Sequence, residues 1–186
     1  DSSGYIYDAE GITMEKLDFI KKLKNQRRGR IQEYATEYKC AFIEGKRPWE
    51  IACDIALPNA TQNELNEADA EVLVKNGCYC VAEGANMPCT PEAIAVFHQN
   101  NVFYAPGKAA NAGGVAVSGL EMSQNSLRYT WSREKVDMKL KGIMKDIHNV
   151  CVKYGKGEDG FINYEKGANI GGFVKIAEAM LAQGLV

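Results

Sequence analysis

The chain has 186 residues, of which 46% are hydrophobic and 9% aromatic, and its 24 acidic residues nearly balance its 22 basic residues. This composition is ordinary for a globular protein, and the balanced charge excludes the strongly basic character of a nucleic-acid or membrane-surface binder. No apolar run approaches the ~18 residues of a membrane span, and the start lacks the basic-then-apolar order of a signal peptide. We therefore expect a cytoplasmic protein with one sizeable core and neither a nucleic-acid nor a membrane partner.

The first four residues, Asp1-Ser2-Ser3-Gly4, contain no Met and have the composition of a turn. Such a turn is typical of the residues that directly follow a strand. We therefore expect that sequence upstream of Asp1 has been removed.

The six cysteines lie mostly within apolar segments, where a free thiol behaves as a small hydrophobic group, so we expect no structural disulfide. Cys78 and Cys80 would share one face of a strand, but two such residues without a second pair are a weak metal signal, and we predict no metal site. His98 and His148 fall in predicted helices outside any triad context and are expected to be structural.

Helical segments begin with Thr13, which can cap a helix whose apolar side carries Leu17, Ile20 and Leu23. Gly29 separates it from a second amphipathic stretch. Thr90, followed by a proline and an acidic residue, opens another helix. The predicted strands are residues 41–43, 51–57, 78–82 and 102–105, and the remaining predicted helices are residues 67–75, a glycine-rich one after Gly113, 132–154 and about 169–183.

Short apolar strands that alternate with helices predict an α/β protein with a doubly wound, mainly parallel sheet. We expect one domain over residues 1–186, with a C-terminal helical segment at about 112–186. Ligands of such folds lie beyond the carboxyl ends of the strands, where residues 83–88 and 106–115 fall. No Gly-x-Gly-x-x-Gly fingerprint of dinucleotide-binding proteins follows any of the predicted strands.

Those two segments each present an asparagine, Asn86 and Asn111, among small residues. An amide offers a donor and an acceptor, which a neutral carboxamide such as nicotinamide can pair with, and small neighbours let a flat ring approach. Asparagine beside glycine is also common in loops with unusual backbone angles, so the residues alone leave both interpretations open.

A basic cluster lies in residues 21–30, where helical spacing can bring Lys24, Arg27 and Arg28 to one face with Arg30 close by. Such a cluster suits a dianionic phosphate, which guanidinium and ammonium groups hold by charge-assisted bonds. A solvated helix face is the alternative interpretation.

The segments Glu83–Pro88 and Pro106–Val115, together with Ser118-Gly119-Leu120-Glu121-Met122, resemble the coenzyme-binding domain of hexameric glutamate dehydrogenases. The likeness runs from Asp1 to Val186. It implies a Rossmann-like domain whose first strand and glycine turn precede Asp1, so that the chain begins at the end of the second strand. The family is usually hexameric, and we expect a homo-oligomer, a homohexamer, when the protein is full length.

The resemblance places the start of the chain at the adenosine ribose of the coenzyme, where a carboxylate favours NAD and basic or hydroxyl groups favour NADP. Asp1 could bond the 2′-hydroxyl of NAD, which leaves dual specificity open. Several cations outnumber that one carboxylate, so we predict NADP. Its phosphate ligands would be Ser2, Lys24, Arg27 and Arg30.

The resemblance also implies roles for residues of the later loops. Asn86 and Asn111 would contact the nicotinamide or its ribose, and Ala60 and Thr61 would lie along the pyrophosphate and ribose. Val115 would pack against the substrate stem, while Ser118 would hydrogen-bond the side-chain carboxylate of glutamate. Two residues depart from the usual pattern, Asn59 in place of Cys and Cys89 in place of Thr.

The implied reaction interconverts glutamate and 2-oxoglutarate plus ammonia by hydride transfer with NADP(H). The catalytic Lys and Asp of the family are expected in a preceding domain, so we name no catalytic residue here and expect these 186 residues alone to be inactive. Two alternatives stay open: a dehydrogenase of branched-chain or aromatic amino acids, and a non-catalytic nucleotide-binding or interaction module.

Overall fold

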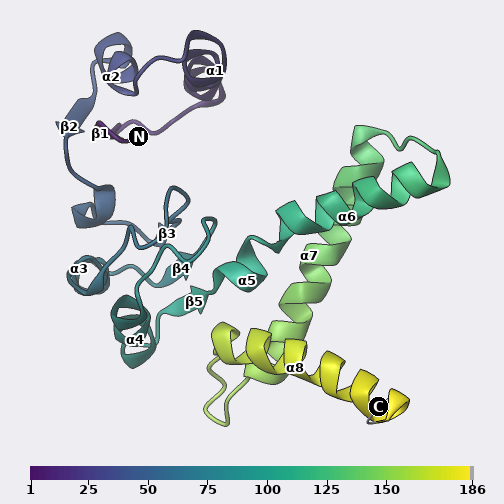
Figure 1. Cartoon of the computed structure of the whole chain (residues 1–186). Coiled ribbons are helices and arrows are strands. Elements are labelled where there is room, and N and C mark those ends of the chain that lie inside the picture. Colours follow the sequence, from purple (N-terminus) through teal and green to yellow (C-terminus); the bar gives the residue numbers. More distant parts are fainter. Residues whose placement is uncertain (185–186) are drawn as a thin grey trace. The chain divides into compact units, whose positions relative to one another are not determined.

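The computed structural model describes residues 1–184, which form two compact units, Asp1–Ile51 and the residues from Ala52 onward (Figure 1). The first unit pairs strand β1 (Gly4–Tyr7) with strand β2 (Ala41–Glu44) in antiparallel register, Tyr5 opposite Ile43. We predicted the strand at 41–43 but missed β1. Its pairing partner lies far along the chain, so the local sequence carries little signal for it.

Helices fill the sequence between those strands. Helix α1 (Met14–Lys22) starts at Thr13, whose hydroxyl accepts the Lys16 backbone N–H at 3.3 Å, as predicted. It runs on into a π-helical turn, η1 (Leu23–Arg27). After a break that contains Gly29, helix α2 (Gln32–Tyr38) follows, and a 3₁₀ turn, η2 (Pro48–Glu50), lies near the end of the unit.

The core of the first unit is small and partly polar. Leu23 and Tyr34 are fully buried, and the Tyr34 ring packs at 6.2 Å from that of Phe19. The Tyr34 hydroxyl donates to Asp8 at 2.6 Å, and Lys16 pairs with the same carboxylate at 2.7 Å. These bonds lower the pKa of the Asp8 carboxyl, so it stays ionised and holds α1 and α2 beside β1.

The second unit contains a three-stranded parallel sheet in the order β3 (Ile55–Ala56), β4 (Cys80–Ala82) and β5 (Phe103–Ala105). Ala56 lies opposite Val81, and Val81 opposite Tyr104. Helix α3 (Glu67–Lys75) connects the first pair and α4 (Pro91–Gln99) the second. The α/β class with a parallel sheet is therefore confirmed. The strand predicted at 51–57 is wrong in extent, because only two of its residues join the ladder.

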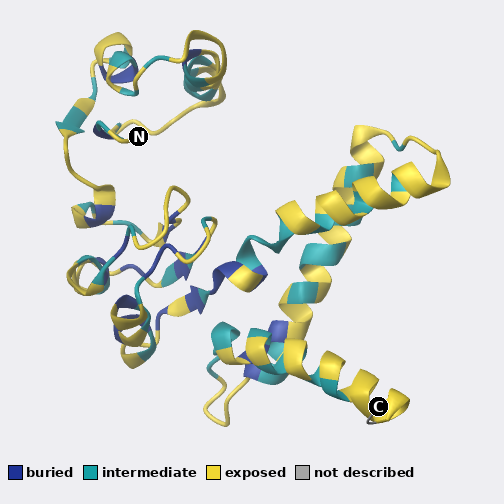
Figure 2. Ribbon diagram, viewed as in Figure 1, coloured by how far each residue is buried: buried dark blue, intermediate teal, exposed yellow. Residues whose placement is uncertain are grey.

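One face of this sheet carries the core. Val81 and Tyr104 are buried on that face, and the Phe97 ring of α4 stacks on Tyr104 with centroids 6.1 Å apart. Figure 2 shows buried stretches of ribbon in β4, β5 and α4. Leu73 of α3 is 1% exposed. Capping side chains begin both helices: Asn66 and Asp69 form a capping box at α3, and Thr90 caps α4 as predicted. The alternation of strand residues thus places the apolar set against α3 and α4.

Helices make up the rest of the second unit. They are the short α5 (Gly107–Ala110), α6 (Ala112–Leu127), α7 (Arg133–Gly155) and α8 (Tyr164–Gln183). Helix α7 packs against both α6 and α8, and α8 also contacts β5. The helix predicted from residue 169 begins five residues earlier because Asn163 caps it, accepting the Lys166 backbone N–H at 2.8 Å. The prediction of one domain over 1–186 stays a prediction.

The core assignment predicts a large difference between neighbours on α3. Leu73→Ala should lower the free energy of unfolding by about 2–5 kcal/mol, because it leaves a cavity under the helix. The adjacent Val72, 38% exposed, is the matched control, and Val72→Ala should change it by less than about 0.5 kcal/mol. Urea unfolding of the two variants measures the difference, and equal losses would contradict this core.

Candidate functional site

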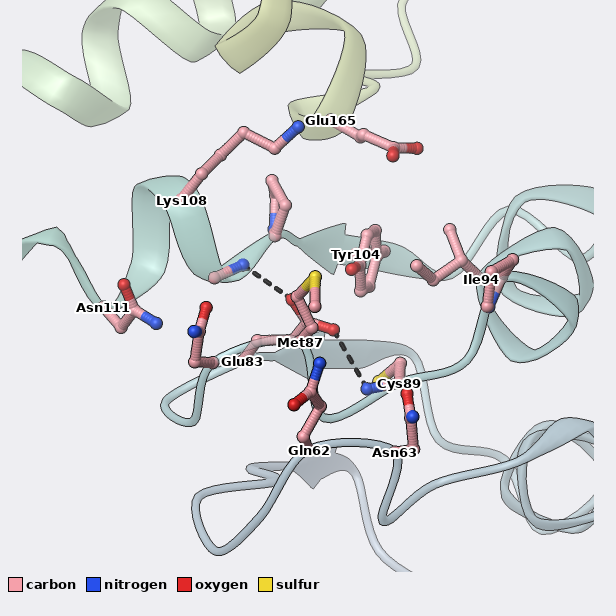
Figure 3. Close-up of a pocket in the computed structure, with 14 residues that line it drawn as sticks. Gln62, Asn63, Glu83, Met87, Cys89, Ile94, Tyr104, Lys108, Asn111 and Glu165 are labelled. Carbon is pink, nitrogen blue, oxygen red and sulfur yellow. Dashed lines mark hydrogen bonds between the residues drawn. The ribbon is translucent and has the colours of Figure 1, made fainter.

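A pocket of about 570 Å³ opens at the carboxyl ends of β4 and β5 in the second unit (Figure 3). Its walls come from three segments that follow strands: the loop at Gln62 and Asn63, the loop at Asn86 and Met87, and the start of α5. Helix α8 contributes Glu165. Parallel strands end at the same edge of a sheet, so this is where the fold gathers its loops.

Glu83, the first residue after β4, is the polar centre of this pocket and is only 3% exposed. One carboxylate oxygen accepts the backbone N–H of Cys89 at 3.3 Å, and the other accepts that of Gly107 at 2.6 Å (Figure 3). The first donor belongs to the Asn86 loop and the second to α5. A single carboxylate therefore fastens both loops, and charge-assisted bonds to backbone N–H groups are strong ones.

Two side chains with ionisable groups lie beside the Glu83 carboxylate. Burial, together with this carboxylate, raises the pKa of the Tyr104 hydroxyl. The same causes raise the pKa of the Cys89 thiol. Both groups therefore stay protonated, and the Cys89 thiol is not a reactive one.

Asn111 supplies a second link between the loops. Its side-chain amide donates to the Ala85 carbonyl at 3.0 Å. Gly107 lies next to this bond, and a Cβ at that position would come within 3.1 Å of both the Ala85 oxygen and the Asn111 amide nitrogen. Asn86 and Asn111 both line the pocket, as the sequence predicted of a shared site. Sequence reasoning gave no role to Glu83, although an acid at the end of a buried strand was the available signal.

The remaining lining residues tie the pocket to α8. Lys108 donates to Asn169 at 2.6 Å, and His98 of α4 lies 2.8 Å from Glu165. His98 and His148 both lie in helices, as predicted. His98 bridges two helices through Glu165, and the His148 ring lies 5.7 Å from that of Tyr164. The structural role expected of both stays a prediction.

Four other predicted site residues lie elsewhere in the second unit. Ala60 and Thr61 are exposed on the loop after β3, where Glu64 accepts the Ala60 backbone N–H at 2.8 Å. Val115 is 78% exposed on α6, and Ser118 lies about one turn further along, bonded to the Gly114 carbonyl at 3.3 Å. None of the four lines the pocket around Glu83.

The basic cluster of the first unit forms around Asp1. One Asp1 oxygen accepts Lys24 at 2.9 Å and the backbone N–H of Ile31 at 3.0 Å. Arg30 donates to the Ser2 hydroxyl at 2.8 Å. The structure thus brings Asp1, Ser2, Lys24 and Arg30 together as the sequence predicted, while Arg27 pairs with Glu33.

The cluster has the donor chemistry of an anion site. Lys24 and Arg27 lie in the π-helical turn η1, and such turns are frequent at functional sites. Guanidinium, ammonium and hydroxyl donors suit a phosphate, although Asp1 and Glu33 already use part of them.

In the described residues 1–184, no group of three or more His, Cys, Asp or Glu could hold a metal ion. Among the helices of the same residues, none is long and apolar enough to cross a membrane.

The structure is that of an α/β protein with a parallel sheet, with amides and a buried carboxylate where the strands end and a cation cluster in the first unit. The family model of glutamate/leucine/phenylalanine/valine dehydrogenases matches residues 1–184. The chain belongs to this family.

Curated relatives are similar along the whole chain. Glutamate dehydrogenase of Bacteroides thetaiotaomicron is 63% identical over 186 residues, covering 100% of this chain and 42% of the relative. NADP-specific glutamate dehydrogenase of Haemophilus influenzae is 57% identical, with 100% and 41% covered. NAD-specific glutamate dehydrogenase of Bacteroides fragilis is 55% identical, with 98% and 41% covered. The chain thus spans about two fifths of the length of these relatives.

A solved structure agrees with the fold. The crystal structure of Plasmodium falciparum glutamate dehydrogenase superposes with a TM-score of 0.94 at 47% identity, and the match covers 100% of this chain and 40% of that one.

The two bonds of Glu83 predict the effect of neutralising it. Glu83→Gln should lower the free energy of unfolding by about 1–3 kcal/mol, because its amide group faces a backbone N–H that loses its acceptor. Exposed Glu71 of α3 provides the control Glu71→Gln, which should have little effect. Hydrogen exchange should also quicken at the Cys89 and Gly107 amides. Unchanged stability and unchanged exchange at both amides would show that the carboxylate does not fasten the loops.

Proposed function

We propose that this chain forms the coenzyme-binding part of a glutamate dehydrogenase, which interconverts L-glutamate and 2-oxoglutarate plus ammonia with NADP(H). One observation carries the proposal: the pocket that gathers Asn86 and Asn111 lies at the carboxyl ends of the strands, in a chain of this family. The names of the similar proteins support glutamate as the substrate. As the coenzyme-binding part, residues 1–186 would form one dinucleotide-binding domain.

The second unit fits a nicotinamide. Asn86 and Asn111 supply amide donors and acceptors on a pocket wall, and the Glu83 bonds keep the two loops that carry them in fixed positions. Ala60 and Thr61 would lie along the pyrophosphate and its ribose. When bound, NADP⁺ supplies the hydride acceptor; the residues of this chain bind and orient it.

The first unit fits the 2′-phosphate of the coenzyme. Ser2, Lys24, Arg27 and Arg30 are the proposed phosphate ligands, and Asp1 is proposed beside the adenosine ribose. The contacts among Asp1, Ser2, Lys24 and Arg30 support a shared site. Both an NADP-specific and an NAD-specific relative are similar to this chain, so the choice between coenzymes depends on the charge balance of this cluster.

The substrate and assembly are part of the same proposal. Val115 would pack against the glutamate stem and Ser118 would bond its side-chain carboxylate, since both lie on one side of α6. We propose that the catalytic acid and base lie outside these residues. The intact protein would be a cytoplasmic homohexamer.

The substrate proposal is tested by amino-acid oxidation in the intact protein. With NADP⁺, kcat/KM for glutamate should exceed that for leucine, valine or phenylalanine at least about 100-fold, since a site built for a charged carboxylate rejects apolar stems. Appearance of the reduced nicotinamide measures turnover. A preference for any of the three apolar amino acids would instead identify one of the other activities in the family name.

The coenzyme proposal is tested at Arg27. Arg27→Ala should weaken NADPH binding by about 1.5–3 kcal/mol if a charge-assisted bond to phosphate is lost, and should leave NADH nearly unchanged. Titration with each coenzyme, followed by its fluorescence, gives both dissociation constants. Lys39→Ala on the same unit, outside the cluster, is the control. Equal losses for NADPH and NADH would remove Arg27 from the phosphate site.

A further inference from the structure

Glu33 is a second carboxylate in the basic cluster, and the sequence gave no reason to notice it. It lies in the first turn of α2, and its side chain is 42% exposed. One of its oxygens pairs with the Arg27 guanidinium, and the other accepts the Arg30 backbone N–H at 3.2 Å. Both contacts are with proposed phosphate ligands.

The chain makes room for this carboxylate. A Cβ at Gly29 would collide with the Glu33 carboxylate and with Leu23, so a side chain at position 29 would displace one of them. Glu33 is therefore held against the cluster by its backbone bond to Arg30 and by the absence of a side chain at Gly29, and it does not simply lie in solvent.

Carboxylates of the first unit neutralise part of the positive charge of the basic cluster. Lys24 pairs with Asp1 and Arg27 with Glu33, whereas Arg30 bonds the neutral Ser2 hydroxyl. An exposed ion pair is weak, so a phosphate can displace it at little cost. The displaced carboxylate nevertheless remains nearby, and it opposes a dianion while leaving a ribose hydroxyl unaffected.

We propose that Glu33 is a specificity-determining residue, which competes with the coenzyme 2′-phosphate for Arg27 and so restrains the preference for NADP over NAD. This inference rests on the proposed function and names a determinant within that same site. Asp1 acts on Lys24, at the other end of the cluster, while Glu33 acts on Arg27.

The test is Glu33→Gln in the intact protein. The amide oxygen can still accept the Arg30 N–H, but the side chain no longer neutralises Arg27. NADPH and adenosine 2′,5′-bisphosphate should bind about three- to tenfold more tightly, while NADH and adenosine 5′-monophosphate change less than about twofold. Calorimetric titration with these four ligands gives the affinities. A disturbed fold would instead weaken all four.

Two controls make the result specific. Glu37→Gln, one turn further along α2 and exposed, should change none of the four affinities by more than about twofold. In an Arg27→Ala background, Glu33→Gln should give a clearly smaller gain, because the residue it competes for is gone. An undiminished gain there overturns the proposed competition.

Other outcomes are equally decisive. Weaker or unchanged NADPH binding by a folded Glu33→Gln variant overturns the inference, as does an equal change for NADPH and NADH. If glutamine at this position prevents folding, Glu33→Ser gives the same neutral test. Failure of the unmodified protein to bind either coenzyme would refute the proposed function itself, whereas normal NADPH binding without an effect of Glu33 refutes only this inference.

Discussion

The second unit depends on one buried carboxylate. Glu83 is the first residue after β4. Its carboxylate accepts one backbone N–H from the loop that carries Asn86 and one from the start of α5, the helix that precedes Asn111. A buried charge is costly unless it is hydrogen-bonded, and here two backbone N–H groups bond the carboxylate, while the Tyr104 hydroxyl and the Cys89 thiol lie beside it. The positions of the two pocket loops thus follow from the hydrogen bonds that the buried Glu83 carboxylate requires.

The bonds of Glu83 order the backbone of both pocket loops. Loops at the end of a parallel sheet lack ladder bonds and would otherwise be the least ordered part of the unit. Glu83 provides the missing bonds from within, and the Asn111 amide adds a link to Ala85. Under the proposed function, binding a flat carboxamide would require little reordering of the backbone, and such preorganisation raises affinity without new contacts.

The first unit follows the opposite principle. Its cations are exposed and paired with carboxylates across short distances, Lys24 with Asp1 and Arg27 with Glu33, so no single bond dominates. Such a cluster tunes an affinity in small steps, because each exposed pair contributes little and each can be exchanged for a ligand. This suits a site where relatives of high identity carry names with different coenzymes.

The sequence by itself determined the elements with strong local signals and the class of the protein. Thr13 and Thr90 begin helices where the capping pattern placed them, residues 67–75 form α3, and the two asparagine segments lie at strand ends because alternating apolar runs break there. Only the tertiary structure decided β1, the short extent of β3, and the contacts of Glu83 and Glu33. The strands depend on pairing partners distant along the chain, and the two carboxylates depend on which donors the folded chain places beside them. Local periodicity encodes neither.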